Sequence, residues 1–206
     1  QVFNAFVATS LAHLLSKHQF YEEAICLLDK IPFEQRDIAV WTMMISTYCQ
    51  ATKYDDALNL YELMKQLGIY PNEKTYAVII SACAESGRID LGKKVHSEVP
   101  SGLMNEYIQA SLMKMYGRFN MLEEASTLFK SIPIDIKKRD TAVWNSMINA
   151  LGQCNSIAEA MSLYLEMKNI VQPDATTYSA VLAVCTSAGD LEAGMNIYST
   201  IPSNMI

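Results

Sequence analysis

The chain has 206 residues, half of them hydrophobic, and it carries a formal net charge of −6. The apolar content predicts a folded protein, and the absence of any apolar run of roughly 18 residues argues against a membrane span. The acidic balance counts against nucleic-acid binding, which usually depends on basic surfaces. The five cysteines are dispersed without a Cys-x-x-Cys pair, so we expect reduced thiols and neither a disulfide framework nor a zinc site.

Internal repetition is the strongest feature of the sequence. The segment VWTMMI at 40–45 returns as VWNSMI at 143–148, and EEA at 22–24 returns at 123–125. A Thr-Tyr pair at 75–76 returns in the same way at 177–178. Because three different segments recur at nearly the same distance, three kinds of unit alternate along the chain, each roughly 34 residues long.

Each of these units is predicted to form two helices. In order, the chain holds the end of a preceding unit at 1–4, the units 5–37, 38–72, 73–105, 106–140 and 141–174, and a truncated unit at 175–206. In the unit 38–72, one apolar stripe at helical spacing starts with Val40 and Trp41, and a second includes Ala57 and Leu60. Gly68 is the expected end of the second helix.

Units of this kind bury their apolar faces against their neighbours, and no strand pattern competes with the helical one. We therefore expect an all-α fold, a solenoid of helix-turn-helix repeats. Trp41, Trp144 and the tyrosines are interpreted as packing residues rather than base-stacking residues. The cysteines are interpreted as small core residues, because Cys83 and Cys185 stand at equivalent positions of the repeat.

Four features of the unit 141–174 carry a family resemblance. They are WNSMI at 144–148, EAMSLY at 159–164, Met-Lys at 167–168 and Pro-Asp at 173–174. This combination resembles the pentatricopeptide repeat motif, over essentially the whole chain. Units 38–72 and 141–174 resemble its P type, 73–105 and 175–206 its L type, and 5–37 and 106–140 its S type. The order resembles the PLS subclass and implies a right-handed α-α superhelix within a longer chain.

The resemblance implies a module that binds single-stranded RNA and reads one base per unit. The implied reading residues are the one after the aromatic position of the first helix and the last residue of the unit. The implied pairs and bases are Thr9 with Asp37 for G, Thr42 with Asn72 for A, and Asn145 with Asp174 for U. The remaining positions are expected to discriminate weakly: Ala77 with Asn105, Ala110 with Asp140, and Ser179 without a partner. The implied footprint is G-A-x-x-U.

The family also places a basic residue at the end of the first helix, where it contacts phosphate. Lys17 and Arg118 hold this position in the S-like units. Uncharged or acidic residues hold it elsewhere, namely Gln50, Glu85, Gln153 and Ser187. We therefore expect weak RNA binding with a shallow salt dependence. The alternative interpretation of the reading residues is that each is only a helix cap or a solvated polar position.

The resemblance further implies an organellar factor, mitochondrial or chloroplast, that recognises sites of C-to-U RNA editing and works with protein editing cofactors. We expect no enzymatic activity, cofactor or metal in this chain, because His-Ser-Glu at 96–98 lacks the Pro-Cys-x-x-Cys that completes a zinc deaminase site. A deaminase-like domain would lie beyond Ile206. The alternative function is a tetratricopeptide-like scaffold for protein–protein interaction, which the acidic charge favours.

Overall fold

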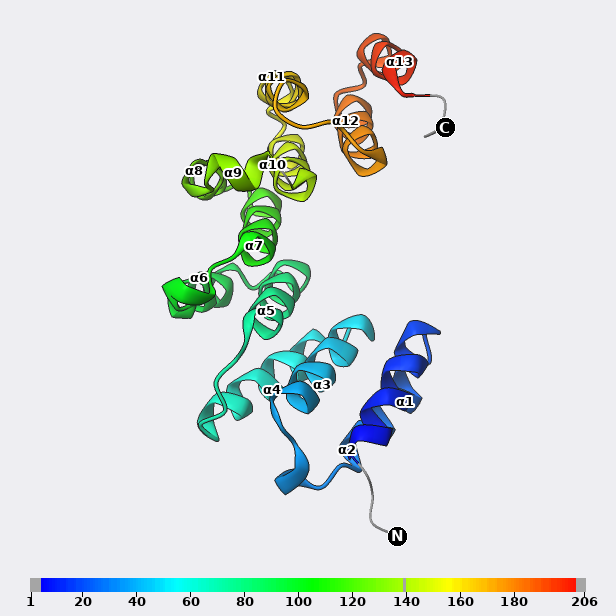
Figure 1. The fold of residues 1–206 in the computed structure, drawn as a ribbon, viewed down its shortest axis with the longest axis vertical. Coiled ribbons are helices and arrows are strands. Elements are labelled where there is room, and N and C mark those ends of the chain that lie inside the picture. The colour runs from blue at the N-terminus through cyan, green and yellow to red at the C-terminus, as the bar shows by residue number, and fades with distance from the viewer. Residues whose placement is uncertain (1–4, 139, 203–206) are drawn as a thin grey trace. The chain divides into compact units, whose positions relative to one another are not determined.

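The computed structural model describes residues 5–138 and 140–202, and in these ranges it consists of paired α-helices without a strand (Figure 1). The first helices of the pairs are α1 (Ala5–Lys17), α3 (Ile38–Gln50), α5 (Glu73–Glu85), α7 (Glu106–Arg118), α10 (Thr141–Gln153) and α12 (Ala175–Ala188). The second helices are α2 (Tyr21–Asp29), α4 (Tyr54–Gln66), α6 (Ile89–Glu98), α8 (Leu122–Ser131), α11 (Ile157–Lys168) and α13 (Leu191–Thr200). The predicted all-α helix-turn-helix fold is thereby confirmed.

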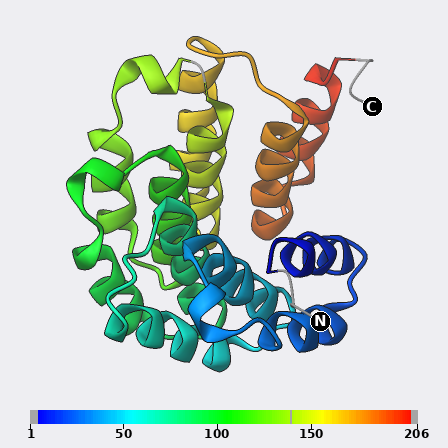
Figure 2. The same ribbon diagram turned by 60° about the horizontal axis from the view of Figure 1, so that its bottom comes forward.

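The helices belong to two compact units, which are described separately: α1–α6 in residues 1–103 and α7–α13 in residues 104–206. Within each unit, a first helix packs against its own second helix and against the first helix of the next pair (Figures 1 and 2). The predicted end of a preceding repeat at residues 1–4 lies outside the described residues. No helix in the described part of the chain is both long and apolar enough to span a membrane.

Three short helical segments stand between the pairs. A 3-10 turn at Phe33–Gln35 precedes α3, a second at Ser101–Leu103 precedes α7, and the short helix α9 (Ile134–Lys137) precedes α10. The α9 segment has a packing role, because the Lys137 carbonyl accepts a 2.9 Å hydrogen bond from the indole nitrogen of Trp144.

Each turn from a first to a second helix contains one residue in the left-handed region of the backbone map. These residues are Gln19, Thr52, Gly87, Asn120, Asn155 and Gly189, with φ between 57° and 76°. A left-handed residue ends a helix and reverses the chain, and glycine adopts this conformation without steric cost. The β-branched Thr52 adopts it at a cost of roughly 1–2 kcal/mol.

Small residues allow the two helices of a pair to approach closely. Ala24, Ala57 and Ala125 are fully buried on the second helices α2, α4 and α8. The tryptophans Trp41 and Trp144 are also fully buried, which confirms their predicted packing role. Because burial of a large aromatic ring removes much apolar surface from water, these two rings are major sources of core stability.

The predicted burial is wrong for some tyrosines and for one cysteine. Tyr70 is 84% exposed and Tyr107 is 68% exposed, because Tyr70 lies in the connection after α4 and Tyr107 lies in the first turn of α7. Cys83 and Cys185 are buried as predicted, whereas Cys26 is exposed on α2.

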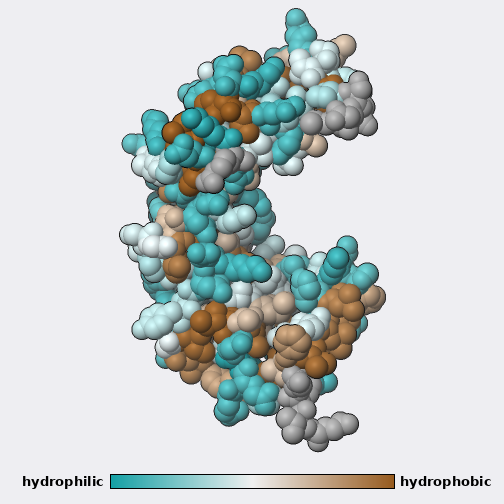
Figure 3. All heavy atoms as spheres, in the orientation of Figure 1, coloured by the Kyte–Doolittle hydropathy of each residue, from teal (hydrophilic) through white to brown (hydrophobic). Residues whose placement is uncertain are grey.

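The surface near α1 is apolar (Figure 3). It includes the exposed side chains of Phe6, Val7, Leu11 and Leu14.

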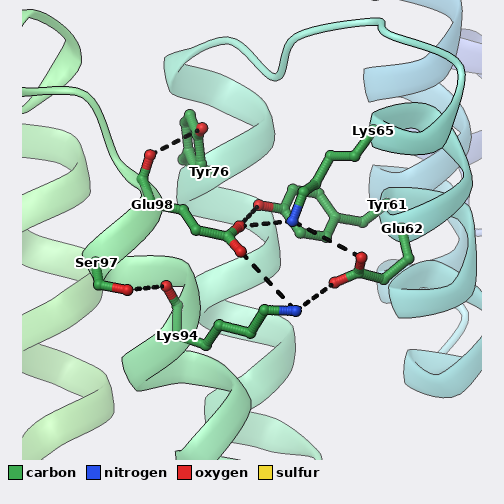
Figure 4. Close-up of polar contacts among 7 residues, drawn as sticks. All are labelled: Tyr61, Glu62, Lys65, Tyr76, Lys94, Ser97 and Glu98. Carbon is green, nitrogen blue, oxygen red and sulfur yellow. Dashed lines mark hydrogen bonds and ion pairs between the residues drawn. The ribbon is translucent and has the colours of Figure 1, made fainter.

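A charged network joins α4 to α6 on the second helices of the first unit (Figure 4). The Glu98 carboxylate accepts hydrogen bonds from the Lys65 ammonium at 2.7 Å and from the Tyr61 hydroxyl at 3.0 Å. Lys94 lies 3.5 Å from Glu62 and 3.9 Å from Glu98. Burial alone would raise the pKa of Glu98, but the hydrogen bonds from Lys65 and Tyr61 and the charges of Lys65 and Lys94 outweigh it and lower that pKa.

The second unit has a different arrangement at the equivalent place. Tyr164 and Lys168 correspond to Tyr61 and Lys65 in the repeat, but Thr200 stands where the first unit has Glu98. The carboxylate that accepts from Tyr61 and Lys65 in the first unit therefore has no counterpart at this position of the second unit.

We predict that Glu98→Gln lowers the free energy of unfolding at pH 7, because it removes the negative charge that accepts hydrogen bonds from Lys65 and Tyr61. The loss should be about 1 kcal/mol, since solvent partly screens these contacts. The pKa of Glu98 is lower in the folded state than in the unfolded chain, where it is about 4. The ionised Glu98 therefore stabilises the fold fully above the pKa of the unfolded chain, and this stabilisation is lost as pH falls through the pKa of the folded state. Urea unfolding at pH 7 and near pH 3 measures both effects. Glu192→Gln, which removes an exposed carboxylate on α13, is the control; equal destabilisation by the two variants would contradict the prediction.

We predict that Thr52→Gly raises the free energy of unfolding by roughly 0.5–1 kcal/mol, because it relieves the left-handed strain and this gain exceeds the added entropy of the unfolded chain. Thr127→Gly, in the middle of α8, is the matched control and is expected to lower stability by roughly 0.3–0.5 kcal/mol, the difference between the helix propensities of the two residues. Thermal and urea unfolding compare the two variants. A loss of stability in Thr52→Gly as large as that in Thr127→Gly would show that no strain is stored at Thr52.

Candidate nucleic-acid interface

The predicted closing residues of the repeats begin the first helices that follow them. A side-chain oxygen of each accepts a backbone N–H in the first helical turn, at distances of 2.7–3.1 Å: Asp37, Asn72, Asn105, Asp140 and Asp174. All five residues therefore cap the helix that follows them. A cap uses only one terminal atom of the side chain, so the second terminal atom can make another contact, as Asp174 Oδ2 does with Thr141.

The structure brings Asn145 and Asp174 together in the second unit. The Asn145 side-chain nitrogen donates to Asp174 Oδ1 over 3.5 Å, a long hydrogen bond. Thr141 donates to the other carboxylate oxygen, Oδ2, at 2.5 Å. Asn145 is 4% exposed, and its Oδ1 has no hydrogen-bond partner among the described residues. An amide oxygen that is buried without a partner costs free energy unless a ligand or water supplies a donor.

Thr42 and Asn72 are connected through a third side chain, Thr75. The Thr42 and Thr75 hydroxyl oxygens are 2.8 Å apart, and Thr75 donates to Asn72 Oδ1 at 2.9 Å. The Thr42 hydroxyl oxygen also lies 2.8 Å from the Ile38 carbonyl oxygen, so its single proton can go either to that carbonyl or to Thr75. The two predicted reading residues of this repeat therefore form one hydrogen-bonded group, although they do not contact each other directly.

The other predicted reading residues are more isolated. Thr9 donates to the carbonyls of its own helix, and within the described residues no hydrogen bond joins it to Asp37. Ala77 and Ala110 are half-buried and carry no polar side-chain group. Ser179 is exposed and donates to the Ala175 carbonyl at 2.9 Å. Hydrogen bonds thus assemble two of the predicted polar pairs, Thr42 with Asn72 and Asn145 with Asp174.

A cavity of about 580 Å³ lies beside the Thr42–Asn72 group in the first unit. Both residues line it, together with Lys17, which is the predicted phosphate-contacting residue of α1. His13 and Lys74 line the same cavity, and the sequence analysis did not find them. The predicted reading pair therefore shares its surroundings with cationic side chains, as binding of an anionic polymer requires.

The negative charge of the chain is concentrated on the second helices. The first helices carry the basic residues Lys17, Lys74, Lys114 and Arg118 and the acidic residues Glu73, Glu85 and Glu106. The second helices carry the basic residues Lys65, Lys93, Lys94, Lys130 and Lys168 and the acidic residues Glu22, Glu23, Asp29, Asp55, Asp56, Glu62, Asp90, Glu98, Glu123, Glu124, Glu159, Glu166 and Glu192. The net charge of −6 is therefore no measure of the charge on the helices that hold the predicted reading residues.

The carboxyl group of Asp174 is held in its ionised form. Its burial alone would raise its pKa, but the hydrogen bonds from Thr141, Thr177 and Asn145 outweigh that effect and lower the pKa below its ordinary value. Asp174 therefore presents hydrogen-bond acceptors and no donor at neutral pH.

Thr75 and Thr177 are further residues of this site that the sequence analysis did not assign to it. Both are fully buried, and each hydroxyl donates to Oδ1 of the closing residue three positions earlier, at 2.9 Å for Thr75 and 3.0 Å for Thr177. The recurring Thr-Tyr pair was a signal for this position. It revealed the repeat, but it did not reveal the direction of the side chain.

Comparisons with known proteins agree with this architecture. Residues 36–85 and 139–201 match the model of the PPR repeat family, and residues 74–101 and 111–133 match the model of the PPR repeat. A pentatricopeptide repeat-containing protein of Arabidopsis thaliana is 34% identical over 84% of this chain and 24% of its own length. Another from the same plant, with chloroplastic in its name, is 32% identical over 95% of this chain and 22% of its own length. The chain thus spans about a quarter of the length of these relatives.

Two solved structures are similar in fold. The pentatricopeptide repeat protein PPR10 in complex with an 18-nucleotide psaJ RNA element has a TM-score of 0.67 and 19% identity, and the match covers 96% of this chain and 34% of PPR10. A tetratricopeptide repeat protein from Parabacteroides merdae has a TM-score of 0.72 and 12% identity over 97% of this chain and 78% of that protein. The helical fold is thus common to both repeat families, whereas the sequence matches are specific: this chain belongs to the pentatricopeptide repeat family.

Proposed function

We propose that this chain is a sequence-specific module that binds single-stranded RNA and recognises bases through paired residues of its repeats. The observation that carries the proposal is the Asn145–Asp174 pair, in which an amide oxygen without a partner adjoins an ionised carboxylate. The family membership and the RNA bound to PPR10, a structural relative, support the same proposal.

The chemistry of the closing residue accounts for the proposed bases. An ionised aspartate can only accept hydrogen bonds, so it suits G and U, whose ring nitrogens carry a proton on the Watson–Crick edge. This applies to Asp37 and Asp174. The amide nitrogen of Asn72 donates instead, so it suits A, whose ring nitrogen on that edge accepts. The second reader of each pair, Thr9, Thr42 or Asn145, supplies the further polar contact.

The proposed footprint is G-A-x-x-U. The two undefined positions correspond to the repeats with Ala77 and Ala110, whose methyl side chains form no hydrogen bond with a base. Asn105 and Asp140 close these repeats, and their contribution to base preference is expected to be small without a polar second reader. Ser179 carries a hydroxyl but lacks a closing partner in this sequence.

We assign phosphate contact to Lys17 and Arg118, with Lys74 as an additional cation beside the cavity of the first unit. Few cations imply that few counterions are released on binding. The affinity should therefore fall only slowly as the salt concentration rises, with a slope of about −0.7 per phosphate contact.

We further propose that the repeats follow the PLS order and that the complete protein is an organellar factor for RNA processing, with site recognition in C-to-U editing as the specific role. The names of four relatives include chloroplastic, which supports an organelle, either the chloroplast or the mitochondrion. Recruitment of protein editing cofactors would belong to this role.

The second candidate function is a tetratricopeptide-like scaffold that binds protein partners. The acidic second helices favour it, because they offer a charged surface that RNA would not use. The polar pairs at Thr42–Asn72 and Asn145–Asp174 favour RNA instead, since a peptide-binding surface has no need for them at the P-like repeats.

We predict that the chain binds a short RNA containing G-A-x-x-U more tightly than RNAs in which one defined base is exchanged. Each exchange should weaken binding about fivefold, which is the effect of one hydrogen bond of about 1 kcal/mol. Exchanges at the two undefined positions are the internal control and should change the affinity less than twofold. Fluorescence anisotropy at one fixed salt concentration measures the series, and equal affinity for all members would contradict base recognition.

We predict that Lys17→Gln weakens binding to every RNA of this series by the same factor and makes the slope of log affinity against log salt less steep by about 0.7, because one phosphate contact is lost. Lys168→Gln, which removes a cation from the second helix α11, is the matched control and should leave the slope unchanged. A change in base preference, or an equal effect of the control, would contradict the phosphate-contacting role of Lys17.

A further inference from the structure

Two buried threonines distinguish the closing residues of the P-like repeats from the others. Thr75 lies three residues after Asn72, and Thr177 lies three residues after Asp174. Both side chains are fully buried in the first turn of a first helix. Because a buried hydroxyl needs a partner, the direction of each hydroxyl is constrained by the oxygen atoms around it.

Each threonine donates twice to the same atom of its closing residue. Asn72 Oδ1 accepts the Thr75 backbone N–H and the Thr75 hydroxyl, both at 2.9 Å. Asp174 Oδ1 accepts the Thr177 backbone N–H at 2.7 Å and the hydroxyl at 3.0 Å. The other closing residues lack this second bond, because the third position after them holds Val40, Ile108 or Val143.

These two hydrogen bonds to one oxygen have a chemical consequence for Asn72. Only an oxygen can accept two donors, so the amide of Asn72 cannot turn over without placing its NH₂ group against the Thr75 N–H. The Nδ2 group is therefore directed away from the helix, as a donor. Among the described residues, the Asn105 side chain accepts only the backbone N–H of Ile108, so the orientation of its amide is less strongly fixed than that of Asn72.

Thr75 also connects the two reading residues of its repeat. Its hydroxyl oxygen lies 2.8 Å from that of Thr42. Two hydroxyl protons serve three contacts here. The contacts are those of Thr42 with the Ile38 carbonyl, of Thr42 with Thr75, and of Thr75 with Asn72. When Thr75 donates to Asn72, it can only accept from Thr42, so the donor and acceptor roles of the two reading residues depend on each other.

We propose that Thr75 and Thr177 are positioning residues for base recognition: Thr75 fixes the Asn72 amide so that Nδ2 is presented to RNA, Thr177 holds the orientation of the Asp174 carboxylate, and together they determine the specificity of the two P-like repeats. This inference rests on the proposed RNA-binding function. Neither threonine needs to touch the base, since its effect is transmitted through the closing residue.

The variants Thr75→Val and Thr177→Val test the proposal, because valine keeps the shape of threonine and removes only the hydroxyl. Thr75→Val should reduce the preference for A at its position about fivefold and leave the preference for U unchanged. Thr177→Val should reduce the preference for U at its position and leave the preference for A unchanged. Thr75→Ser and Thr177→Ser should restore the preference. Thr47→Val removes a fully buried hydroxyl elsewhere on a first helix and should affect neither preference.

A loss of affinity for all RNAs without a change in preference would overturn the proposal, because it would indicate a purely structural role. The orientation of the Asn72 side-chain amide, measured by NMR in the free chain, separates this inference from the function on which it rests. A fixed amide in the wild type and an averaged amide in Thr75→Val would support the positioning role even if the wild type recognised no base. An amide that stays fixed in Thr75→Val would overturn the positioning role.

Discussion

The arrangement of this chain depends on one hydrogen bond that recurs at each junction between its repeats. The last residue of a repeat, an aspartate or asparagine, accepts the N–H of the next first helix through a side-chain oxygen. This bond starts a helix that has four unpaired N–H groups at its beginning. It also ties one end of the side chain to the helix and leaves the other polar atom outside the cap. Stability and the proposed base recognition thus depend on the same residue.

The positions of these capping residues depend on the turn within each helix pair and on the packing of the second helix against the first. The turns with left-handed residues reverse the chain after each first helix, and fully buried small residues such as Ala24 and Ala57 bring the second helix close. The second helices carry most of the acidic side chains, and in the first unit the Glu98 network joins two of them. The first helices carry mainly apolar and uncharged polar residues, with four cations and three carboxylates. An acidic protein can therefore hold a site that suits an anionic ligand.

The sequence was sufficient to predict the helix pairs, because the periodic apolar residues and Gly68 follow local rules of helix formation. It also predicted the burial of Trp41 and Trp144, which recur in register. The exposure of Tyr107 and Cys26 was not predictable in this way, since it depends on which face of a helix meets a neighbour.

The sequence pointed to Thr42 with Asn72 and to Asn145 with Asp174 as pairs, but it did not predict how the members of each pair are connected. Thr42 reaches Asn72 through the hydroxyl of Thr75, a residue of the following helix. Contacts of this kind depend on the packing of two helices and on side-chain rotamers, for which helical periodicity carries no signal. Lys74 was missed for a similar reason, because its proximity to Thr42 arises from the fold.

The central claim is that the pair of polar residues in a P-like repeat determines the base that it recognises. The double variant Thr42→Asn with Asn72→Asp makes the first P-like pair identical to the Asn145–Asp174 pair. Competition binding with RNAs that differ only at the second base of the footprint measures its preference directly. The account predicts that the preferred base at this position changes from A to U while the preferences at the other positions stay as they are. A double variant that still prefers A at this position would contradict it.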